Sequence, residues 1–395
     1  MSTLSVQQIT GVIQLDTPFQ VTLNSAFGTA NSGFNRANSV NTVSIAAFNK
    51  ANTGLANATG TFAGDLTVTG NVVISSNTVS VGGNNISPVQ SFRNKIINGN
   101  FDYWQRETSN TSVNNLQYVA DRWRTDRTGS TGNISRQSFS LGQTSVPNEP
   151  WYFHRTIVTS SAGSGNSCTL LQLIESVRTL AGQTATLSFW AKADSTKNIA
   201  IEFYQYFGSG GSPSSAVTTI GVTTCALTSS FQKFTITVNI PSISGKTLGS
   251  NNDDCLGVLF WFDAGSTFNS RTNSLGQQSG TFDIAQVQLE AGSVATPFEV
   301  RPPGIELALC QRYYETGYMF IQGYLGGPGY IGVGGRLAVS KRAFPTVSLS
   351  LTASGSYSSG LTAQNLSSES IGFNGLFNIS TAAYGFVNFS ASAEL

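Results

Sequence analysis

The chain has 395 residues, and only 10% of them are charged, with 21 Lys or Arg against 20 Asp or Glu. Soluble domains carry about 25% charged residues, so we expect a surface that is polar but almost neutral. A net charge of +1 gives no electrostatic reason to expect nucleic acid or an anionic membrane as a partner. Hydrophobic residues make up 39% and aromatic residues 11%, which favours a folded core over disorder.

The cysteines and the single histidine argue against several kinds of site. No two of the four cysteines have a C-x-x-C spacing, so we expect four buried thiols rather than a zinc or redox site. His154 is the one histidine of the chain, which argues against a histidine-based catalytic triad or zinc site. The first residues, Met1–Leu4, contain neither a basic nor an apolar region, and no stretch of about 18 residues is apolar throughout. We therefore expect synthesis in a cytoplasm, no secretion signal and no membrane insertion.

An internal repeat runs through residues 23–62. Phe27, Phe34 and Phe48 lie on one seven-residue grid, and an alanine follows each of them three positions later. This heptad pattern predicts a short coiled coil with large residues at a and small residues at d. Its predicted trimer core consists of Phe27, Ala30, Phe34, Ala37, Phe48, Ala51 and Leu55. Because Asn, Ser, Thr and Gly are poor helix formers, an irregular extended shaft stays open as the alternative.

The period changes over residues 63–92, where short alternating runs of Val, Leu and Ile are interrupted by glycines. Such a pattern predicts short strands that are too few to be stable in a single chain. Three copies of the chain wrapped around one another would bury these strands. The repeat and the strands together predict a homotrimeric shaft, which residues 1–22 precede.

Residues 93–303 have the pattern of a separate β domain, and all five tryptophans lie here. We expect four of these side chains to be mostly buried, namely Trp104, Trp123, Trp190 and Trp261. Strand-like runs recur between polar turns, at Ala185–Ala193, Ile199–Tyr206, Lys233–Ile240, Cys255–Phe262 and Phe282–Leu289. No convincing amphipathic helix interrupts them, although Leu170–Leu180 is compatible with a short one. The sequence predicts an antiparallel jelly-roll β-sandwich.

Two prolines in the segment Arg301–Gly304 end this domain. Apolar residues at helical spacing then predict a linker helix over residues 304–315. Residues 316–395 place aromatic residues among glycines and serines, which predicts a small C-terminal β domain that forms the tip. Two short basic clusters, Asp121–Arg124 and Lys341–Arg342, are interpreted as solvated surface.

The aromatic residues of the C-terminal domain are candidates for ligand recognition. Loops on a rigid β scaffold usually carry recognition, and aromatic faces stack on sugar rings alongside hydrogen bonds. A neutral surface of aromatic and hydroxyl groups fits a neutral saccharide. We interpret Tyr324, Tyr330 and Phe344 as ligand-facing residues, with core packing as the alternative for each.

Three segments resemble bacteriophage tail fibre proteins, particularly those of cyanophages. The repeats such as Ala-Phe-Asn-Lys-Ala-Asn at 47–52, followed by Gly-Asp-Leu-Thr-Val-Thr-Gly-Asn at 64–71, resemble a fibre shaft. The run Asn-Lys-Ile-Ile-Asn-Gly-Asn-Phe-Asp-Tyr-Trp-Gln-Arg at 94–106 resembles the opening of a fibre jelly roll. The runs Val-Gln-Leu-Glu at 287–290, Thr-Pro-Phe-Glu-Val-Arg-Pro at 296–302 and Leu-Ala-Leu-Cys-Gln-Arg-Tyr-Tyr-Glu at 307–315 resemble its close. The match covers roughly residues 25–315.

The resemblance implies a homotrimeric structural protein of a virion that attaches the particle to a receptor on the host cell, expected to be a glycan. Residues 1–22 would then bind the phage tail, for example a baseplate or nozzle protein. The jelly-roll opening also resembles carbohydrate-binding modules, in which two acidic residues often hold a structural calcium ion. The matching positions are Asp102 and Asp283, and ordinary turn or edge carboxylates are the alternative. No other cofactor is expected.

Two other functions stay open, a purely structural adaptor or head fibre and a tailspike hydrolase. Glycan cleavage usually needs two carboxylates on either side of the bond, and Asp253–Asp254, Asp263 and Glu299 are the candidates. The short repeated rungs of a parallel β-helix, typical of tailspike enzymes, do not occur in this sequence. We therefore expect no enzymatic activity and assign no catalytic residue.

Overall fold

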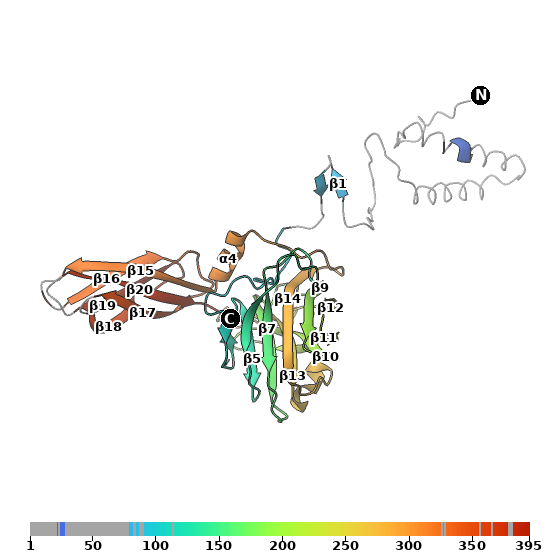
Figure 1. Ribbon diagram of the computed structural model, residues 1–395, viewed down its shortest axis with the longest axis horizontal. Coiled ribbons are helices and arrows are strands. Elements are labelled where there is room, and N and C mark those ends of the chain that lie inside the picture. Colours follow the sequence, from blue (N-terminus) through green and yellow to red (C-terminus); the bar gives the residue numbers. More distant parts are fainter. Residues whose placement is uncertain are drawn as a thin grey trace, which may run out of the picture. The chain divides into compact units, whose positions relative to one another are not determined.

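The computed structural model describes residues 22, 24–27, 79–81, 84–86, 91–112, 114–324, 327, 329–354, 357–364, 366–377 and 382–395 (Figure 1). The chain divides into two compact units, Met1–Pro88 and Val89–Leu395. In the first unit, residues 22 and 24–27 are helical, and β1 (Val79–Val81) pairs antiparallel with β2 (Asn84–Ile86). Within the part of the chain that is described, no helix is long and apolar enough to cross a membrane.

The predicted trimer core falls almost wholly outside the described residues. Phe27 is the exception, and its side chain is exposed in the single chain. The other predicted core positions lie outside the described ranges, namely Ala30, Phe34, Ala37, Phe48, Ala51 and Leu55. The coiled coil and the trimer therefore stay predictions.

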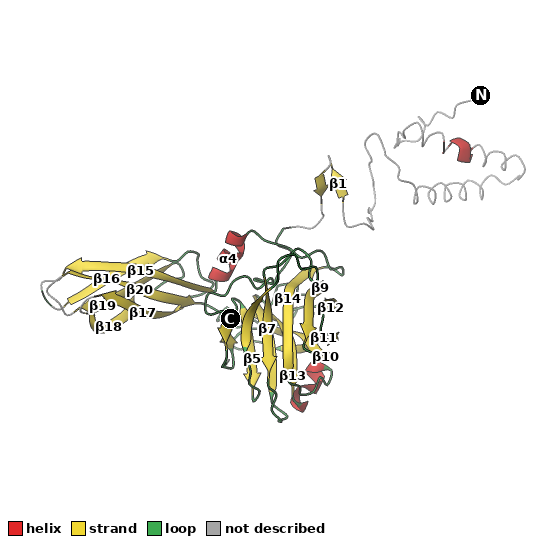
Figure 2. Ribbon diagram, viewed as in Figure 1, coloured by secondary structure: helices red, strands yellow, loops and turns green. Residues whose placement is uncertain are grey.

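The larger unit begins with a β-sandwich of two six-stranded antiparallel sheets (Figure 2). The first sheet contains, in spatial order, β11 (Val217–Leu227), β10 (Lys197–Tyr206), β13 (Cys255–Ala264), β8 (Ser167–Glu175), β5 (Trp123–Thr128) and β4 (Gln117–Tyr118). The second contains β12 (Gln232–Asn239), β9 (Thr184–Ala193), β14 (Gly280–Ala291), β7 (Tyr152–Val158), β6 (Ile134–Ser138) and β3 (Ser109–Asn110). From β7 to β14 the chain passes back and forth between the sheets, as in a jelly roll. The predicted antiparallel, mainly β fold is confirmed, and its five strand-like runs are β9, β10, β12, β13 and β14.

Aromatic side chains from both sheets meet in the core. Phe189 of β9 and Phe260 of β13 have ring centroids 5.0 Å apart, and Phe262 and Phe282 stack at 4.9 Å. Full burial of one such side chain stabilises a fold by about 1.5–3 kcal/mol. The edge strand β12 alternates buried and exposed positions, which is the two-residue period expected where only one face meets the core.

The first sheet is covered on its outer face as well as on its core face. This finding corrects the short helix suggested for Leu170–Leu180. Every residue of β13 is buried, and nearly every residue of β8. The short helices η2 (Ser266–Phe268) and α3 (Asn269–Thr272) follow β13, and Phe268 packs on the outer face of the sheet with Leu395. A strand that is buried on both faces has a continuous apolar run without alternation. The helix suggested for Leu170–Leu180 is therefore wrong, because this run forms most of β8.

A nine-residue helix, α4 (Pro303–Gln311), connects the sandwich to a second β domain. This C-terminal domain consists of two three-stranded antiparallel sheets. The first contains β15 (Tyr314–Tyr324), β20 (Ala382–Ser392) and β17 (Thr346–Ser354) in that order. The second contains β16 (Gly329–Arg336), β19 (Ser370–Phe377) and β18 (Tyr357–Gln364). Ile321 and Val387 of the first sheet pack with Phe373 of the second, so the two sheets share a small core.

Buried ionic contacts join the C-terminal domain to the sandwich. The Arg122 guanidinium is 1% exposed, forms an ion pair with Glu394 and donates to the Leu173 carbonyl. Its central carbon lies 3.5 Å from the centroid of the Tyr313 ring. Burial is the largest single effect and would lower the pKa of Arg122, but Glu394, Tyr313 and Tyr118 together outweigh it and raise the pKa. The Tyr118 hydroxyl also donates to the Leu395 carbonyl at 2.9 Å.

The sequence had suggested that the two basic clusters, Asp121–Arg124 and Lys341–Arg342, are solvated surface, and this interpretation is wrong. Asp121, Arg122 and Trp123 are all buried, and so is Lys341, which forms an ion pair with Glu315. Arg122 pairs with Glu394 and Lys341 with Glu315, both distant in sequence, whereas Arg124 pairs with Asp126 in the same strand. The basic side chains therefore connect the domains or brace their interior.

We expect Glu394→Ala to lower the free energy of unfolding by about 3–5 kcal/mol, because it leaves the Arg122 charge buried without its partner. Denaturant unfolding of the full chain measures this loss. Glu369→Ala is the matched control, since Glu369 is exposed and surface substitutions usually change stability by less than about 0.5 kcal/mol. Equal effects of the two substitutions would contradict the role given to Arg122 and Glu394.

Candidate functional site

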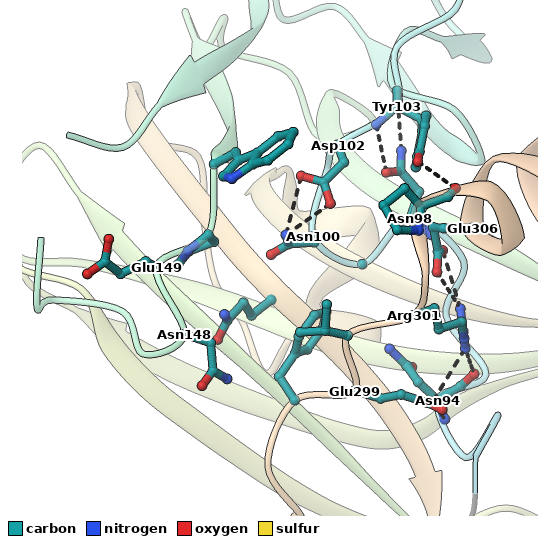
Figure 3. Close-up of a pocket in the computed structure, with 17 residues that line it drawn as sticks. Asn94, Asn98, Asn100, Asp102, Tyr103, Asn148, Glu149, Glu299, Arg301 and Glu306 are labelled. Atoms are coloured by element: carbon teal, nitrogen blue, oxygen red, sulfur yellow. Dashed lines mark hydrogen bonds and ion pairs between the residues drawn. The ribbon is translucent and has the colours of Figure 1, made fainter. Parts of the chain in front are cut away.

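A cavity of about 280 Å³ lies where the opening of the sandwich domain meets its close (Figure 3). Four segments line it: the loop 94–103, the loop 148–151, the strand β14 at Gln286, and residues 298–306, which lead into α4. Figure 3 shows Asn148 and Glu149 on one side of the cavity and Arg301 and Glu306 on the other. Two runs about 200 residues apart in the sequence therefore build one site.

The wall formed by residues 94–99 runs beside an irregularity in β14. Pairing of β14 with β7 ends at Ile284, and pairing with β9 shifts register between Ala285 and Gln288, so the backbone of β14 beyond Ile284 bonds to residues 94–99 instead of β7. Asn94 forms two of these bonds, because its Nδ2 donates to the Val287 carbonyl at 3.1 Å and its Oδ1 accepts from the Leu289 amide at 3.0 Å. The Gly99 carbonyl accepts from the Val287 amide at 2.8 Å.

Gly99 can only be a glycine at this close approach. A Cβ atom built on Gly99 would lie 2.1 Å from the Val287 carbonyl oxygen, well inside van der Waals contact. The Asn-Gly pair of the opening run therefore has a structural cause. Asn98 clamps the loop by donating to the carbonyls of Tyr103 and Asp121, at 2.8 and 3.0 Å.

Arg301 ties the close of the domain to its opening. Its guanidinium donates to the carbonyls of Asn94 and Ile96 and forms an ion pair with Glu306 at 3.0 Å. Glu299 accepts from the Asn94 amide at 2.9 Å, and Glu306 accepts from the Asn98 amide. Both carboxylates are thus engaged with the backbone of the opening loop, and they fix this wall of the cavity.

The opposite wall is the turn Asn148–Trp151 before β7. Asn148 and Glu149 both have a positive φ, at 64° and 41°, a backbone conformation that costs energy outside glycine. The Trp151 carbonyl accepts from the Phe139 amide at 3.0 Å, which holds the end of the turn. The Trp151 side chain lines the cavity and is 72% exposed. A large aromatic face is thereby presented to solvent at the cavity.

Two buried amide oxygens in the cavity accept no hydrogen bond from any described residue. Gln286 is 3% exposed, and its Nε2 donates to the Pro147 carbonyl at 2.8 Å, which leaves its Oε1 without a donor. Asn100 donates from Nδ2 to both oxygens of Asp102, and its Oδ1 also lacks a donor. A buried acceptor without a donor costs about 1–3 kcal/mol. Both oxygens are therefore set to accept hydrogen bonds from a ligand or from water.

Asp102 adds a carboxylate to the same cavity. Burial is the main cause that raises its pKa, and the hydrogen bond from Asn100 partly opposes the shift. Together with Gln286 and Asn100, it forms a set of acceptors beside the aromatic face of Trp151. Chemically, this arrangement suits a ligand that carries several hydroxyl groups on an apolar ring.

The two predicted calcium ligands have different surroundings. Asp102 lines the cavity, whereas Asp283 does not. The Asp283 carboxylate pairs with Arg155 at 2.7 Å and lies 3.5 Å from the Lys192 ammonium. No group of three or more Asp, Glu, His or Cys side chains in the described ranges gathers as a metal site. Calcium binding at Asp102 and Asp283 stays a prediction.

The carboxylates considered for glycan cleavage each have a local structural contact. Asp253 accepts from the Ser209 amide at 2.7 Å, and Asp254 accepts from the Val177 amide at 2.8 Å. Asp263 is buried and accepts from the Gln278 amide at 2.8 Å. Of the set, Glu299 alone lines the cavity, where it holds the Asn94 amide.

The aromatic residues predicted to face a ligand lie in the C-terminal domain, away from this cavity. Tyr330 on β16 and Phe344, in the segment between β16 and β17, are exposed. Tyr324 is the last residue of β15, and its side chain is outside the described part of the structure. Their role in recognition stays a prediction.

Sequence reasoning missed Trp151 and Gln286. Trp104, Trp123 and Trp261 are buried as expected and Trp190 is half-buried, but Trp151 had no assigned role. The run Pro147-Asn-Glu-Pro150 just before it is a turn signal that pointed to an exposed position. Gln286 lies within a strand-like run, and nothing local marks its bulge.

No protein-family model matches the chain, and no curated protein matches its sequence. Solved structures similar to it include a CBM4 module, with 18% identity over 49% of this chain and 98% of that one, at a TM-score of 0.29. A family 11 carbohydrate-binding module from Clostridium thermocellum has 11% identity over 48% and 99%, at 0.29. The enzymatically active domain of tailspike protein 4 of bacteriophage CBA120 has 14% identity over 52% and 22%, at 0.30. Likenesses this low assign the chain to no family.

The wall of the cavity packs on His154, the one histidine of the chain. Its ring lies 5.2 Å from Phe101 and stacks on Trp104 at 5.7 Å, centroid to centroid. Burial lowers the pKa of His154 from 6.5 to about 3. Between these values the unfolded chain binds a proton that the folded chain excludes. Keeping His154 neutral in the core therefore costs the folded chain nothing above pH 6.5. As the pH falls from 6.5 towards 3, proton binding favours the unfolded chain and the free energy of unfolding decreases.

We expect the free energy of unfolding to fall by up to about 1.4 kcal/mol per pH unit through this window because of His154. In His154→Phe this component should be absent, so its stability should depend less on pH. Denaturant unfolding of both proteins at several pH values between 7 and about 4 measures the two slopes. Parallel slopes would show that His154 is not buried in its neutral form.

Proposed function

We propose that the chain is a non-enzymatic tail fibre protein of a phage virion, which trimerises and attaches the particle to a glycan on the host cell. The observation that carries glycan binding is the exposed indole of Trp151 beside the donor-free oxygens of Gln286 and Asn100. The fibre-like runs in the sequence support the virion assignment.

The chemistry of the cavity favours a saccharide over other small ligands. The hydroxyl groups of a sugar donate hydrogen bonds, and Gln286 Oε1 and Asn100 Oδ1 are acceptors without a donor, beside the Asp102 carboxylate that accepts from Asn100. The C–H face of a sugar ring packs on an aromatic ring such as that of Trp151. Pockets that combine apolar surface with a few placed polar groups are typical ligand sites. Such pockets have volumes of about 300–1,000 Å³. The cavity, at about 280 Å³, lies just below this range, which fits a short stretch of glycan.

The sequence runs that resemble phage fibres also support this position for the site. The opening run at 94–106 and the closing run at 296–302 are hydrogen-bonded to each other through Asn94, Glu299 and Arg301. Their residues form the cavity wall and fix its shape. A module that keeps these two runs would therefore keep this wall of the cavity.

Replacing Trp151 by Ala should reduce binding to the host surface polysaccharide about tenfold, because the aromatic face accounts for roughly 1.4 kcal/mol. Binding of the full chain to host cells and to a glycan array measures the loss. Leu141→Ala is the control, since Leu141 is exposed on the same domain outside the cavity. Unchanged binding by Trp151→Ala would contradict the site. An intact chain that binds no cell or glycan would favour a purely structural virion component.

The full chain should form a trimer, since three copies would bury the phenylalanine heptad and the short strands of the shaft. Light scattering of the purified chain measures its mass. Phe34→Asp should weaken the assembly, because three buried carboxylates would repel one another around the axis. Phe34→Leu, which keeps an apolar side chain, should retain it. A monomer mass for the unmodified chain would contradict the proposed assembly.

A further inference from the structure

Three aromatic side chains form a cluster on the outward face of the first sheet of the C-terminal domain. Tyr318 and Phe320 project from β15 and Phe386 from β20, and they are 69%, 47% and 45% exposed. The Phe386 ring lies 5.6 Å from that of Tyr318 and 5.3 Å from that of Phe320, centroid to centroid. Neighbouring residues in the same strands, Ile321 and Val387, are buried in the core. The cluster therefore belongs to the solvent face of the sheet.

A shallow groove of about 630 Å³ continues from Tyr318 across the sheet. Hydroxyl and amide side chains line it, namely Thr316, Ser348, Ser350, Asn388 and Ser390. The strand register places these residues in two rows across the sheet. One row is Thr316, Ser390 and Ser348, and the next is Tyr318, Asn388 and Ser350. Apolar rings and hydrogen-bonding groups thus lie side by side on one flat surface.

The three strands place no charge on this face, although the Arg106 guanidinium of the sandwich lies over the Tyr314 ring at one end of it. Glu315 is the one charged residue in the sequences of β15, β17 and β20, and it is buried against Lys341. A ligand of the face therefore gains nothing from carrying a charge, and an ionic ligand would lose hydration without compensation. The chemistry fits a neutral ligand with hydroxyl groups.

The size of the cluster favours a small ligand over a second copy of the chain. Tyr and Phe side chains have on the order of 200 Å² each, so the exposed parts of the three rings amount to about 300 Å². A stable protein interface buries about 800 Å² on each partner. Apolar patches of about 300–600 Å² on a single protein are often functional.

We propose that the outward face of β15, β20 and β17 is a second glycan-binding surface, which selects neutral oligosaccharides. Sugar rings stack on Tyr318, Phe320 and Phe386, and the groove beside Tyr318 hydrogen-bonds their hydroxyl groups. The surface shares no residue with the Trp151 cavity and rests on separate observations. It also differs from the residues predicted from the sequence, because Tyr330 belongs to the other sheet of the domain.

The test uses the full chain with Trp151→Ala, which removes the cavity's aromatic face. This variant should still bind neutral oligosaccharides on an array, and its affinity should change less than about twofold between low and high salt, because no charge pair is involved. Adding Tyr318→Ala should reduce this remaining binding about tenfold, and Phe386→Ala should have a similar effect. Adding Leu141→Ala, a control at an exposed apolar residue that lines neither the cavity nor the groove, should leave it unchanged.

Three results would overturn the proposal. They are a complete loss of binding in Trp151→Ala alone, equal losses from Tyr318→Ala and Leu141→Ala, or a changed oligomeric mass of Tyr318→Ala. The last result would identify the face as a contact between copies of the chain. An unchanged melting temperature of Tyr318→Ala establishes that the domain stays folded. If Trp151→Ala has no effect while Tyr318→Ala abolishes binding, the cavity proposal fails and this one stands.

Discussion

The buried charge of Arg122 is the constraint on which the arrangement of the larger unit depends. Its guanidinium needs the Glu394 carboxylate, the Leu173 carbonyl and the Tyr313 ring at the same time. These partners come from the sandwich, from the junction after α4, and from the end of the C-terminal domain. A buried charge without its partner costs several kcal/mol. Separating the two domains would therefore carry a free-energy cost of this size. The buried Arg122 thus ties the C-terminal domain to the sandwich.

The same stretch of chain also supports the cavity. Asp121, next to Arg122, accepts from Asn98 through its backbone carbonyl, and the Trp123 indole donates to the Asn98 carbonyl at 3.0 Å. Asn98 in turn fixes the loop that carries Asn100 and Asp102. Docking of the C-terminal domain and the shape of the cavity wall thus depend on three consecutive residues, so a change at the junction is expected to reach the cavity through the backbone.

The sequence predicted what local patterns determine and missed what distant contacts determine. Strands with β-branched and aromatic residues, such as β9 and β13, were located correctly because their residue types favour strands. The run that forms β8 was ambiguous because burial on both faces removes the alternation. Arg122 looked like a surface residue because Glu394 lies 272 positions away. The cavity likewise needs four segments that are far apart in sequence, so Gln286 could not be recognised.

Several of the few charged residues of the chain lie in its interior, and the strands of the second proposed surface place none on their exposed face. Arg122, Glu202, Asp283 and Lys341 are buried and paired, whereas the exposed face of β15, β20 and β17 is neutral. A neutral surface gains little from nonspecific ionic attraction, so a ligand of this face would be held by ring stacking and hydrogen bonds. Each such contact is weak, and binding then has to come from several sites held at fixed spacing. If both proposed surfaces bind glycans, the buried Arg122–Glu394 pair would help to keep them at one spacing, because a flexible connection would dilute the effective concentration of the second site.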